Sequence, residues 1–535
     1  MKNAIRLLAL LLAALLLTGC LPEPNVPEQT DTQPEDPVIA FSDMVYVRPD
    51  MAKLEQLLAD AKESAAGEDL DRIIAMIYEF YDAYDAFYTN YSLADIRYSG
   101  DLTDAAWEAE CDFCAANSAR VDAMLEELFY ALAKSPCLAQ LEGEEYFGAG
   151  YFDAYQGENN WDAAFTALLE QESALISRYY ELASVGAEYE TGSEEYYAAC
   201  GEDMAELLVE LVRLRHEIAA CWGYEDYNEF ATDFYHYRDY TVAQSREYLE
   251  DIRRELVELY TQVNRSGIWD AGFDWAGESM TYGYVRTAAE RMGGTVAAAF
   301  DLMDRAGLYD IAYSRNKYPS SFEVYLTSYD APFVFLCPGL TTYDYLTFAH
   351  EFGHFCNDYA SWGSYAGVDV LEIFSQGMEF LSLCYVDGTE QLTKMKMADS
   401  LCIYVEQAAF ASFEMQMYDI PEEELSVQAL LELYDRVARE YGFDSIGYDP
   451  REFVTINHYY TNPLYIISYV VSNDASMQLY QLELQESGAG LACFEKNLAT
   501  EEYYFLAFLE AAGLESPFDE GRIQAVRSTL EAALE

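Results

Sequence analysis

Apolar and aromatic residues recur at three- and four-residue spacing along most of this chain, and this period constrains the fold more than any other feature. Residues 68–88 (EDLDRIIAMIYEFYDAYDAFY) have it first. It continues in four more segments, at 103–134, 159–183, 193–222 and 240–265. Because an α-helix turns once in 3.6 residues, such spacing gives each segment one apolar face. The sequence therefore predicts a mainly α protein, a large helical body whose many aromatic residues line helix interfaces.

One segment departs from the helical period. Residues 321–336 (SFEVYLTSYDAPFVFL) are rich in β-branched and aromatic residues, with a turn signal near Asp330-Ala331-Pro332. We expect a β-hairpin or two short strands here, followed by a helix that Thr341 or Thr342 can cap. An exposed edge of this small sheet could pair with the backbone of an extended peptide.

The helix after the hairpin carries His350-Glu351-Phe352-Gly353-His354, in a chain with only 5 histidines. Residues i and i+4 share a helix face, so His350 and His354 can bind one metal ion together. Catalytic zinc is held by this pattern, with Glu351 beside the water that zinc activates. We therefore predict one Zn²⁺ ion here, with manganese or cobalt as alternatives.

Residues 369–380 are the best candidate segment for a third metal ligand. The segment starts 15 residues after His354, which allows a turn and a second helix that returns beside the first. Glu372 and Glu379 are seven positions apart, so they share a helix face, and a buried carboxylate needs a partner. A solvated acidic face is the alternative, but the neighbouring residues are apolar. We predict that Glu372 is the third ligand and that Glu379 or Asp369 contacts a histidine's second ring nitrogen.

Residues 457–469 (NHYYTNPLYIISY) gather a histidine and several tyrosines at a loop-to-helix junction. Such groups can donate hydrogen bonds to the oxyanion that forms when a peptide bond is hydrolysed. By residue chemistry alone, an equal alternative is that these residues are aromatic members of the core.

Together these segments resemble the thimet oligopeptidase and oligoendopeptidase F family of zinc peptidases. The similar stretches are 350–354, 369–380 and 458–469, with a weaker similarity at 218–240. The resemblance implies that Glu372 is the third zinc ligand. It also implies that His458 and Tyr465, with Tyr469 as a further candidate, bind substrate and stabilise the oxyanion. The family's fold is a helical body split by a deep channel, which admits short unfolded peptides for cleavage at internal bonds.

Two positions depart from the family's pattern. Asn357 stands where many members carry a third histidine, and Phe374 stands where many carry proline or histidine. Neither position is a zinc ligand, so these departures bear on subsite preference more than on activity. Residues 41–200 carry no motif that the resemblance explains.

The N-terminus is an export signal. A short basic start and an apolar run at 7–17 precede Leu17-Thr18-Gly19-Cys20. This ending resembles a bacterial lipoprotein cleavage box, which implies removal of residues 1–19 and a lipid on Cys20. An ordinary secretory signal is the alternative. We expect an extracytoplasmic protein that is lipid-anchored to a bacterial membrane.

Composition divides the rest of the chain. Residues 20–40 hold the predicted lipidated cysteine and five of the 14 prolines, so we expect an extended tether. An N-terminal helical region at 41–200 and a catalytic zinc peptidase region at 201–535 follow. The net charge of −65 excludes nucleic acid as a partner, because phosphates would be repelled. The expected partners are short peptides, and the membrane through the lipid anchor.

Three other functions agree with parts of this pattern. A zinc carboxypeptidase, or a protease of folded proteins, would use the same metal residues with another specificity. A membrane-tethered peptide-binding lipoprotein without turnover belongs to a different class. The intact Glu351 argues against this last function, because a binding protein has no use for a general base.

Overall fold

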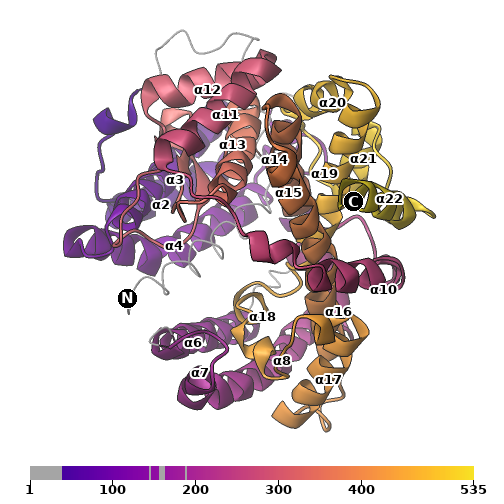
Figure 1. Cartoon of the computed structure of the whole chain (residues 1–535). Coiled ribbons are helices and arrows are strands. Elements are labelled where there is room, and N and C mark those ends of the chain that lie inside the picture. The colour runs from indigo at the N-terminus through magenta and orange to yellow at the C-terminus, as the bar shows by residue number, and fades with distance from the viewer. Residues whose placement is uncertain (1–38, 144–145, 156–162, 187–188, 365, 535) are drawn as a thin grey trace.

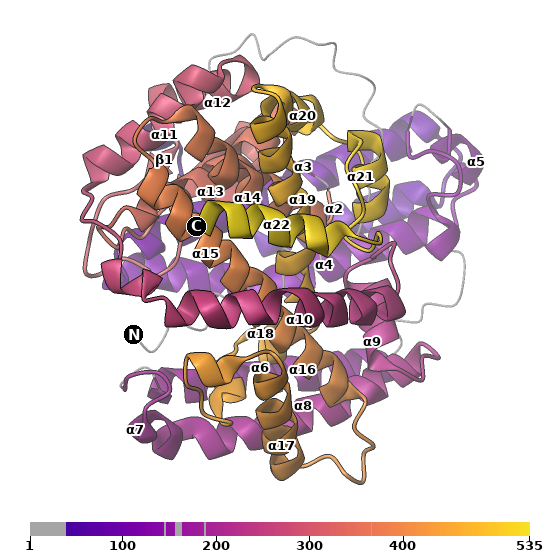
Figure 2. The same cartoon turned by 45° about the vertical axis from the view of Figure 1, so that its right-hand side comes forward.

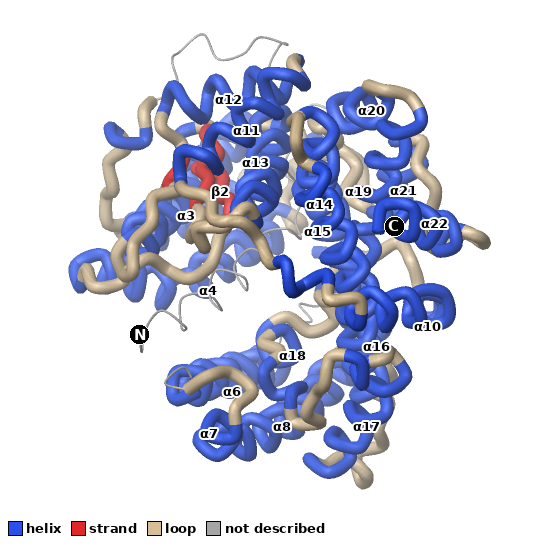
Figure 3. The backbone as a smooth tube through the Cα atoms, viewed as in Figure 1, coloured by secondary structure: helices blue, strands red, loops and turns tan. Residues whose placement is uncertain are grey.

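The structure is a computed structural model that describes residues 39–143, 146–155, 163–186, 189–364 and 366–534. The predicted signal peptide, Cys20 and nearly all of the tether lie outside the described residues. In the described part the protein is mainly helical, as predicted, and it contains one small sheet (Figures 1 and 3). None of the helices in these segments combines the length and the apolarity that a membrane span requires.

The N-terminal helices pack on one another around a core of their own. They are α2 (Met51–Ala65), α3 (Leu70–Gly100), α4 (Ala105–Leu132) and the short α5 (Leu138–Leu141). An aspartate caps each of the first three through its side chain: Asp50, Asp69 and Asp104. The predicted helix at 68–88 is thus real but extends a further three turns, because the apolar face continues beyond Phe87 and stays buried.

A second group of helices lies below the first in Figure 1. This group contains α6 (Ala163–Gly186), α7 (Glu194–Tyr196), α8 (Glu202–Cys221), α17 (Val427–Glu440) and α18 (His458–Thr461). Helix α6 packs on α8, and buried residues from both belong to the large central core. Helix α10 (Val242–Arg265) runs between the lower and upper groups in Figure 2. The boundary near residue 200 stays a prediction.

The remaining helices complete the upper part and its connections. They are α9 (Tyr227–Phe230), α11 (Glu278–Met292), α12 (Gly294–Ala306), α13 (Tyr343–Ser361), α14 (Val368–Tyr385), α15 (Glu390–Cys402), α16 (Ala408–Tyr418), α19 (Ile467–Gln485), α20 (Ala489–Asn497), α21 (Phe505–Ala512) and α22 (Arg522–Leu534). Helix α14 packs against α13 on one side and α19 on the other. Its neighbours bury most of its length, which explains why its sequence is so apolar.

The predicted hairpin is present. Strands β2 (Phe322–Leu326) and β3 (Ala331–Phe335) are antiparallel, and β1 (Tyr309–Asp310) pairs with β3 in parallel. The strand order β1-β3-β2 leaves β2 at an edge. The turn comes slightly earlier than predicted, because Asp330 takes a left-handed conformation (φ 45°) and the next two residues already belong to β3.

Helix α13 follows the sheet directly and packs on both long strands. Thr342 occupies the N-cap position without a cap hydrogen bond, whereas the hydroxyl of Thr341 accepts one from the N–H of Tyr343 at 3.3 Å. The helix ends where Trp362 and Gly363 take left-handed angles (φ 62° and 92°), at the predicted turn. The chain can then reverse into α14 after a short loop.

Candidate metal centre and active site

The two histidines of the motif lie on the same side of α13. His350 and His354 are four residues apart, and their ring centroids are separated by 5.2 Å. Both residues are partly buried, and Glu351 is buried with 7% of its surface exposed. Helix geometry alone therefore brings the two imidazoles together, as their spacing predicts.

The backbones of α13 and α14 approach each other closely at Gly353. A Cβ atom at this position would overlap the carbonyl oxygen of Phe374 and lie 2.7 Å from Cα of Ser375. Only glycine permits this contact without displacement of a backbone. The close approach brings Glu372, one turn earlier on α14, beside the histidines.

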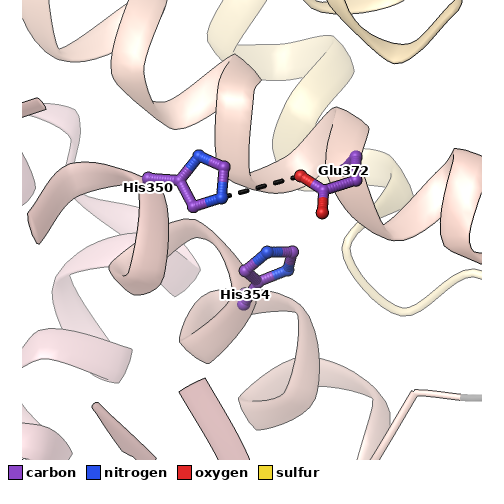
Figure 4. A group of neighbouring side chains, drawn as sticks. All are labelled: His350, His354 and Glu372. Atoms are coloured by element: carbon purple, nitrogen blue, oxygen red, sulfur yellow. Dashed lines mark ion pairs between the residues drawn. The ribbon is translucent and has the colours of Figure 1, made fainter. Parts of the chain in front are cut away.

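His350, His354 and Glu372 form one cluster (Figure 4). One potential ligand atom from each lies within 4.8 Å of the others, and Oε2 of Glu372 is 3.6 Å from Nε2 of His350. The hydroxyl of Ser375 donates to the same Oε2 atom at 3.0 Å and orients the carboxylate. Glu372 is 8% exposed, so it does not belong to a solvated acidic face.

The cluster has the donor set and the surroundings of a zinc site. Two imidazoles and one carboxylate are a common ligand set for catalytic zinc. Nδ1 of His350 is 2.8 Å from Oε1 of Glu379, which leaves Nε2 directed at the cluster. The other oxygen of Glu379 is 2.7 Å from Nζ of Lys396, a residue only 1% exposed. Such support orients a ligand histidine, so the residues present fit a divalent metal ion.

The charges around the cluster favour a positive charge at its centre. Burial lowers the pKa of His350, but the hydrogen bond to Glu379 and nearby carboxylates outweigh burial and raise the pKa to about 9. Burial and the charge of His350 hold the pKa of His354 well below its usual value, so its ring is neutral and able to bind a metal. Burial, with the charges of Glu372 and Glu379, raises the pKa of Glu351 to about 7. A carboxylate of that pKa can both take up and release a proton near neutral pH.

The 457–469 segment lies against this cluster. The hydroxyl of Tyr465 is 3.5 Å from Oε1 of Glu372. The ring of His458 stacks on Tyr465, with centroids 5.4 Å apart, and Nε2 of His458 is 3.4 Å from the hydroxyl of Tyr469. Tertiary structure therefore brings the histidine and both predicted tyrosines to the metal residues.

The protonation states of this segment suit hydrogen-bond donation. Burial lowers the pKa of His458 to about 4, so the ring is neutral at physiological pH. Burial raises the pKa of Tyr465 well above its usual value and also raises that of Tyr469, so both phenols keep their protons. A neutral imidazole and two phenolic O–H groups can each donate to a developing oxyanion.

Several solved structures share the fold of this chain. A PZ peptidase A bound to an inhibitor superposes with a TM-score of 0.78 at 19% identity, over 92% of this chain and 99% of that one. A Bacillus anthracis protein assigned as an oligoendopeptidase F has a TM-score of 0.75 at 20% identity, over 93% and 98% of the two chains. The chain has no significant match among curated proteins. At these identities the similarity establishes the fold.

A sequence profile of the Peptidase M3 N-terminal domain matches residues 41–160. The N-terminal part of the chain therefore matches the M3 family of metallopeptidases. The match falls where the sequence analysis finds only helical periodicity, because these residues carry packing positions and no catalytic motif. The M3 resemblance therefore extends from the motif-bearing half of the chain to the N-terminal helices.

Asp369 has a different partner from the one predicted. Of the two acids considered for a histidine's second nitrogen, Glu379 makes that contact. Asp369 instead accepts hydrogen bonds from Arg238 at 3.1 Å and from the hydroxyl of Tyr240 at 2.8 Å. It lies at the start of α14, more than two turns before Glu379, and so faces a different neighbour.

Sequence reasoning missed two buried cations, Lys396 and Arg238. Lys396 sits on α15 among residues without an unusual pattern, and nothing local distinguishes it from a surface lysine. Arg238 lies in the weakly similar stretch at 218–240, beside aromatic residues, where a buried arginine could have been suspected. Both become evident only when their acidic partners on α14 are brought beside them.

The two departures from the family's pattern have structural roles here. The side-chain amide of Asn357 donates to the carbonyl of Leu498 at 2.6 Å and is buried. The ring of Phe374 packs edge-on against Phe494 and Phe508. Neither side chain belongs to the His350–His354–Glu372 cluster.

Proposed function

We propose that this protein is an M3 metallopeptidase, a zinc-dependent oligoendopeptidase that cleaves internal bonds of short, unfolded peptides outside the cytoplasm. The observation that carries the proposal is the meeting of two separate segments at Glu372. One oxygen of its carboxylate faces His350 at 3.6 Å, and the other faces the hydroxyl of Tyr465 at 3.5 Å. Metal ligands and oxyanion donors are thus adjacent, as peptide hydrolysis requires.

The proposed ligands are His350, His354 and Glu372, and zinc bound there would supply Lewis-acid chemistry that polarises a peptide carbonyl and acidifies water. Glu351 acts as the general base, because its place between His350 and His354 on α13 lets it take a proton from water and pass it to the leaving amine. Tyr465, Tyr469 and His458 donate hydrogen bonds to the oxyanion. Glu379 keeps the ring of His350 in its ligand orientation.

Two buried cations next to the candidate site cannot bind the free C-terminus of a peptide, as a carboxypeptidase site would have to. A carboxypeptidase needs a cation that can bind the free carboxylate of its substrate. Lys396 and Arg238, the cations that contact acids of α14, are both buried in ion pairs with Glu379 and Asp369. Neither has a free charge to offer a peptide terminus.

The location outside the cytoplasm rests on the N-terminal sequence. Leu17-Thr18-Gly19-Cys20 follows a basic start and an apolar run of 11 residues, in the order that a lipoprotein signal requires. A diacylated Cys20 would hold the enzyme at a membrane surface, with the Pro-rich segment as a spacer.

The deciding experiment is cleavage of an internally quenched peptide blocked at both ends. The purified full chain is assayed with zinc, then with a chelator, then with zinc restored. We expect internal cutting that the chelator abolishes and zinc restores. Cutting only of peptides with a free C-terminus would establish a carboxypeptidase instead, and tight peptide binding by zinc-loaded protein without any cutting would establish a binding lipoprotein.

A further inference from the structure

Arg238 makes three hydrogen bonds from a buried position, 9% exposed. Its Nε donates to Oδ2 of Asp369 at 3.1 Å, its Nη1 to the carbonyl of Leu464 at 2.9 Å, and its Nη2 to the hydroxyl of Ser468 at 2.9 Å. Tyr240 donates to the same carboxylate oxygen at 2.8 Å. One planar guanidinium therefore connects α14 with the segment that enters α19.

The acceptors of Arg238 are next to the residues proposed to act on substrate. Asp369 lies one helical turn before Glu372 on α14. Leu464 directly precedes Tyr465, and its carbonyl is the group that Arg238 binds. Arg238 therefore contacts both the segment that carries Glu372 and the segment that carries Tyr465.

Arg238 also binds the residue that precedes the second tyrosine, Tyr469. Ser468 directly precedes Tyr469, whose hydroxyl is 3.4 Å from His458. The hydroxyl of Ser472, one turn further along α19, donates to the backbone carbonyl of Asp369 at 3.0 Å. Two sets of hydrogen bonds therefore join the start of α14 to the start of α19: those of Arg238 and the one from Ser472.

The turn at Leu464 depends on these contacts for its shape. Leu464 has a φ of 59°, a left-handed conformation that a branched side chain rarely adopts. Its N–H donates to Oε1 of Glu414 at 2.9 Å, and Nε2 of His236 is 2.8 Å from the carbonyl of Pro463. Together with Arg238, surrounding side chains satisfy the backbone groups of a turn that is strained by itself.

We propose that Arg238 is a positioning residue that sets Tyr465 and Tyr469 relative to Glu372. The inference rests on the function proposed above and adds a residue that touches neither metal ligand nor substrate. Arginine suits the role because its rigid fork donates in three directions from one plane. Lysine keeps the charge but concentrates its donors on a single flexible nitrogen, so it cannot reproduce all three contacts.

Arg522 offers a matched control for the substitution Arg238→Lys. It is 3% exposed and also makes three hydrogen bonds, to the side chain of Asp474 at 2.8 Å, to Gln481 at 3.0 Å and to the carbonyl of Asp474 at 3.4 Å. These acceptors also lie on α19, but none is adjacent to a residue of the candidate site. Arg522→Lys therefore tests the loss of a buried arginine without the loss of this connection.

For Arg238→Lys we expect kcat on the blocked peptide to fall roughly 10- to 100-fold, with KM within about 3-fold of the wild type. Bound zinc should stay at one ion per chain in both variants. Arg522→Lys and Arg238→Lys should lower Tm by similar amounts. In Arg522→Lys, however, kcat should stay within about 2-fold of the wild type. Equal losses of kcat in both variants, or an unchanged kcat in Arg238→Lys, would overturn the proposal.

A double variant tests whether Arg238 acts through Tyr465. If it does, Arg238→Lys combined with Tyr465→Phe should lose little more activity than Tyr465→Phe alone, whereas independent roles would multiply the two losses. Loss of zinc from Arg238→Lys would instead mean that the residue stabilises the metal ligands, against the proposal. Wild-type cleavage is measured alongside, so failure of the proposed function itself is recognised separately.

Discussion

The hydroxyl of Tyr465 lies 3.5 Å from Oε1 of Glu372, the carboxylate whose other oxygen faces His350. The two residues are 93 positions apart in the chain, with Glu372 on α14 and Tyr465 in the turn before α19. Tyr465 is buried, and the partly buried ring of His458 stacks on it. The contact brings an oxyanion donor within reach of an atom bound at the histidines. Because metal binding and oxyanion donation are assigned to different residues, mutation of one residue at a time can separate these two roles.

Tyr465→Phe removes the phenolic hydroxyl and should leave the ligand set intact. We expect kcat to fall roughly 10- to 100-fold with unchanged zinc content, because one donor to the oxyanion is lost. Tyr459→Phe is the control, since Tyr459 lies in the same segment and its hydroxyl donates to the carbonyl of Phe410 at 3.0 Å. If both variants retain full activity, Tyr465 is a core residue only.

Glu351→Gln should abolish turnover while the protein keeps its fold and its metal. The loss should be on the order of 10³-fold in kcat, because the amide cannot accept the proton of the attacking water. Steady-state kinetics and zinc analysis of the same sample measure the two effects together. Substantial turnover by the metal-loaded variant would contradict the general-base assignment.

Glu372→Ala should release the metal, because it removes one of three protein ligands. Glu379→Gln should weaken zinc affinity by a smaller factor, roughly 10- to 100-fold, through the orientation of His350. Competition with a chromogenic chelator measures both affinities. Stoichiometric zinc retained by Glu372→Ala would place the third ligand elsewhere.

Asp95 should make stability depend on pH. It is buried in α3, and burial raises its pKa to about 7. The folded state therefore binds more protons than the unfolded state between about pH 4 and pH 7, so stability falls as pH rises through this window.

Asp95→Asn removes this titration. Relative to wild type, its free energy of unfolding should rise on the order of 2 kcal/mol between about pH 5 and pH 8, as measured by urea unfolding. A difference that is the same at both pH values would mean that the buried carboxyl is not protonated at the lower pH.

Cys20→Ala should release the protein from the membrane. We expect wild-type protein expressed in a bacterial host to incorporate labelled palmitate and to sediment with membranes, because a diacylated cysteine anchors it. Cys221→Ala, which alters an exposed cysteine elsewhere, should behave like the wild type. Unlabelled, soluble wild-type protein would support the alternative of an ordinary secretory signal.

The sequence by itself was sufficient where the governing interactions are local. The four-residue spacing of His350 and His354 determines that they share a helix face, because helix geometry depends only on neighbouring residues. The hairpin at 321–336 and the helices of α3 and α10 follow from local periodicity in the same way. Their ends differ by a few residues or, for α3, by three turns, because burial against distant helices decides where a helix continues.

Only the tertiary structure decided which distant groups meet. Glu379 and Asp369 are equivalent by sequence, yet one contacts His350 and the other Arg238, because α14 rotates each toward a different neighbour. Lys396 and Arg238 are ordinary cations in the sequence and become buried partners only in the fold. The free energy of each ion pair depends on burial and on a partner distant in the chain, 17 positions away for Lys396 and Glu379 and 131 for Arg238 and Asp369. No local sequence pattern encodes such a contact.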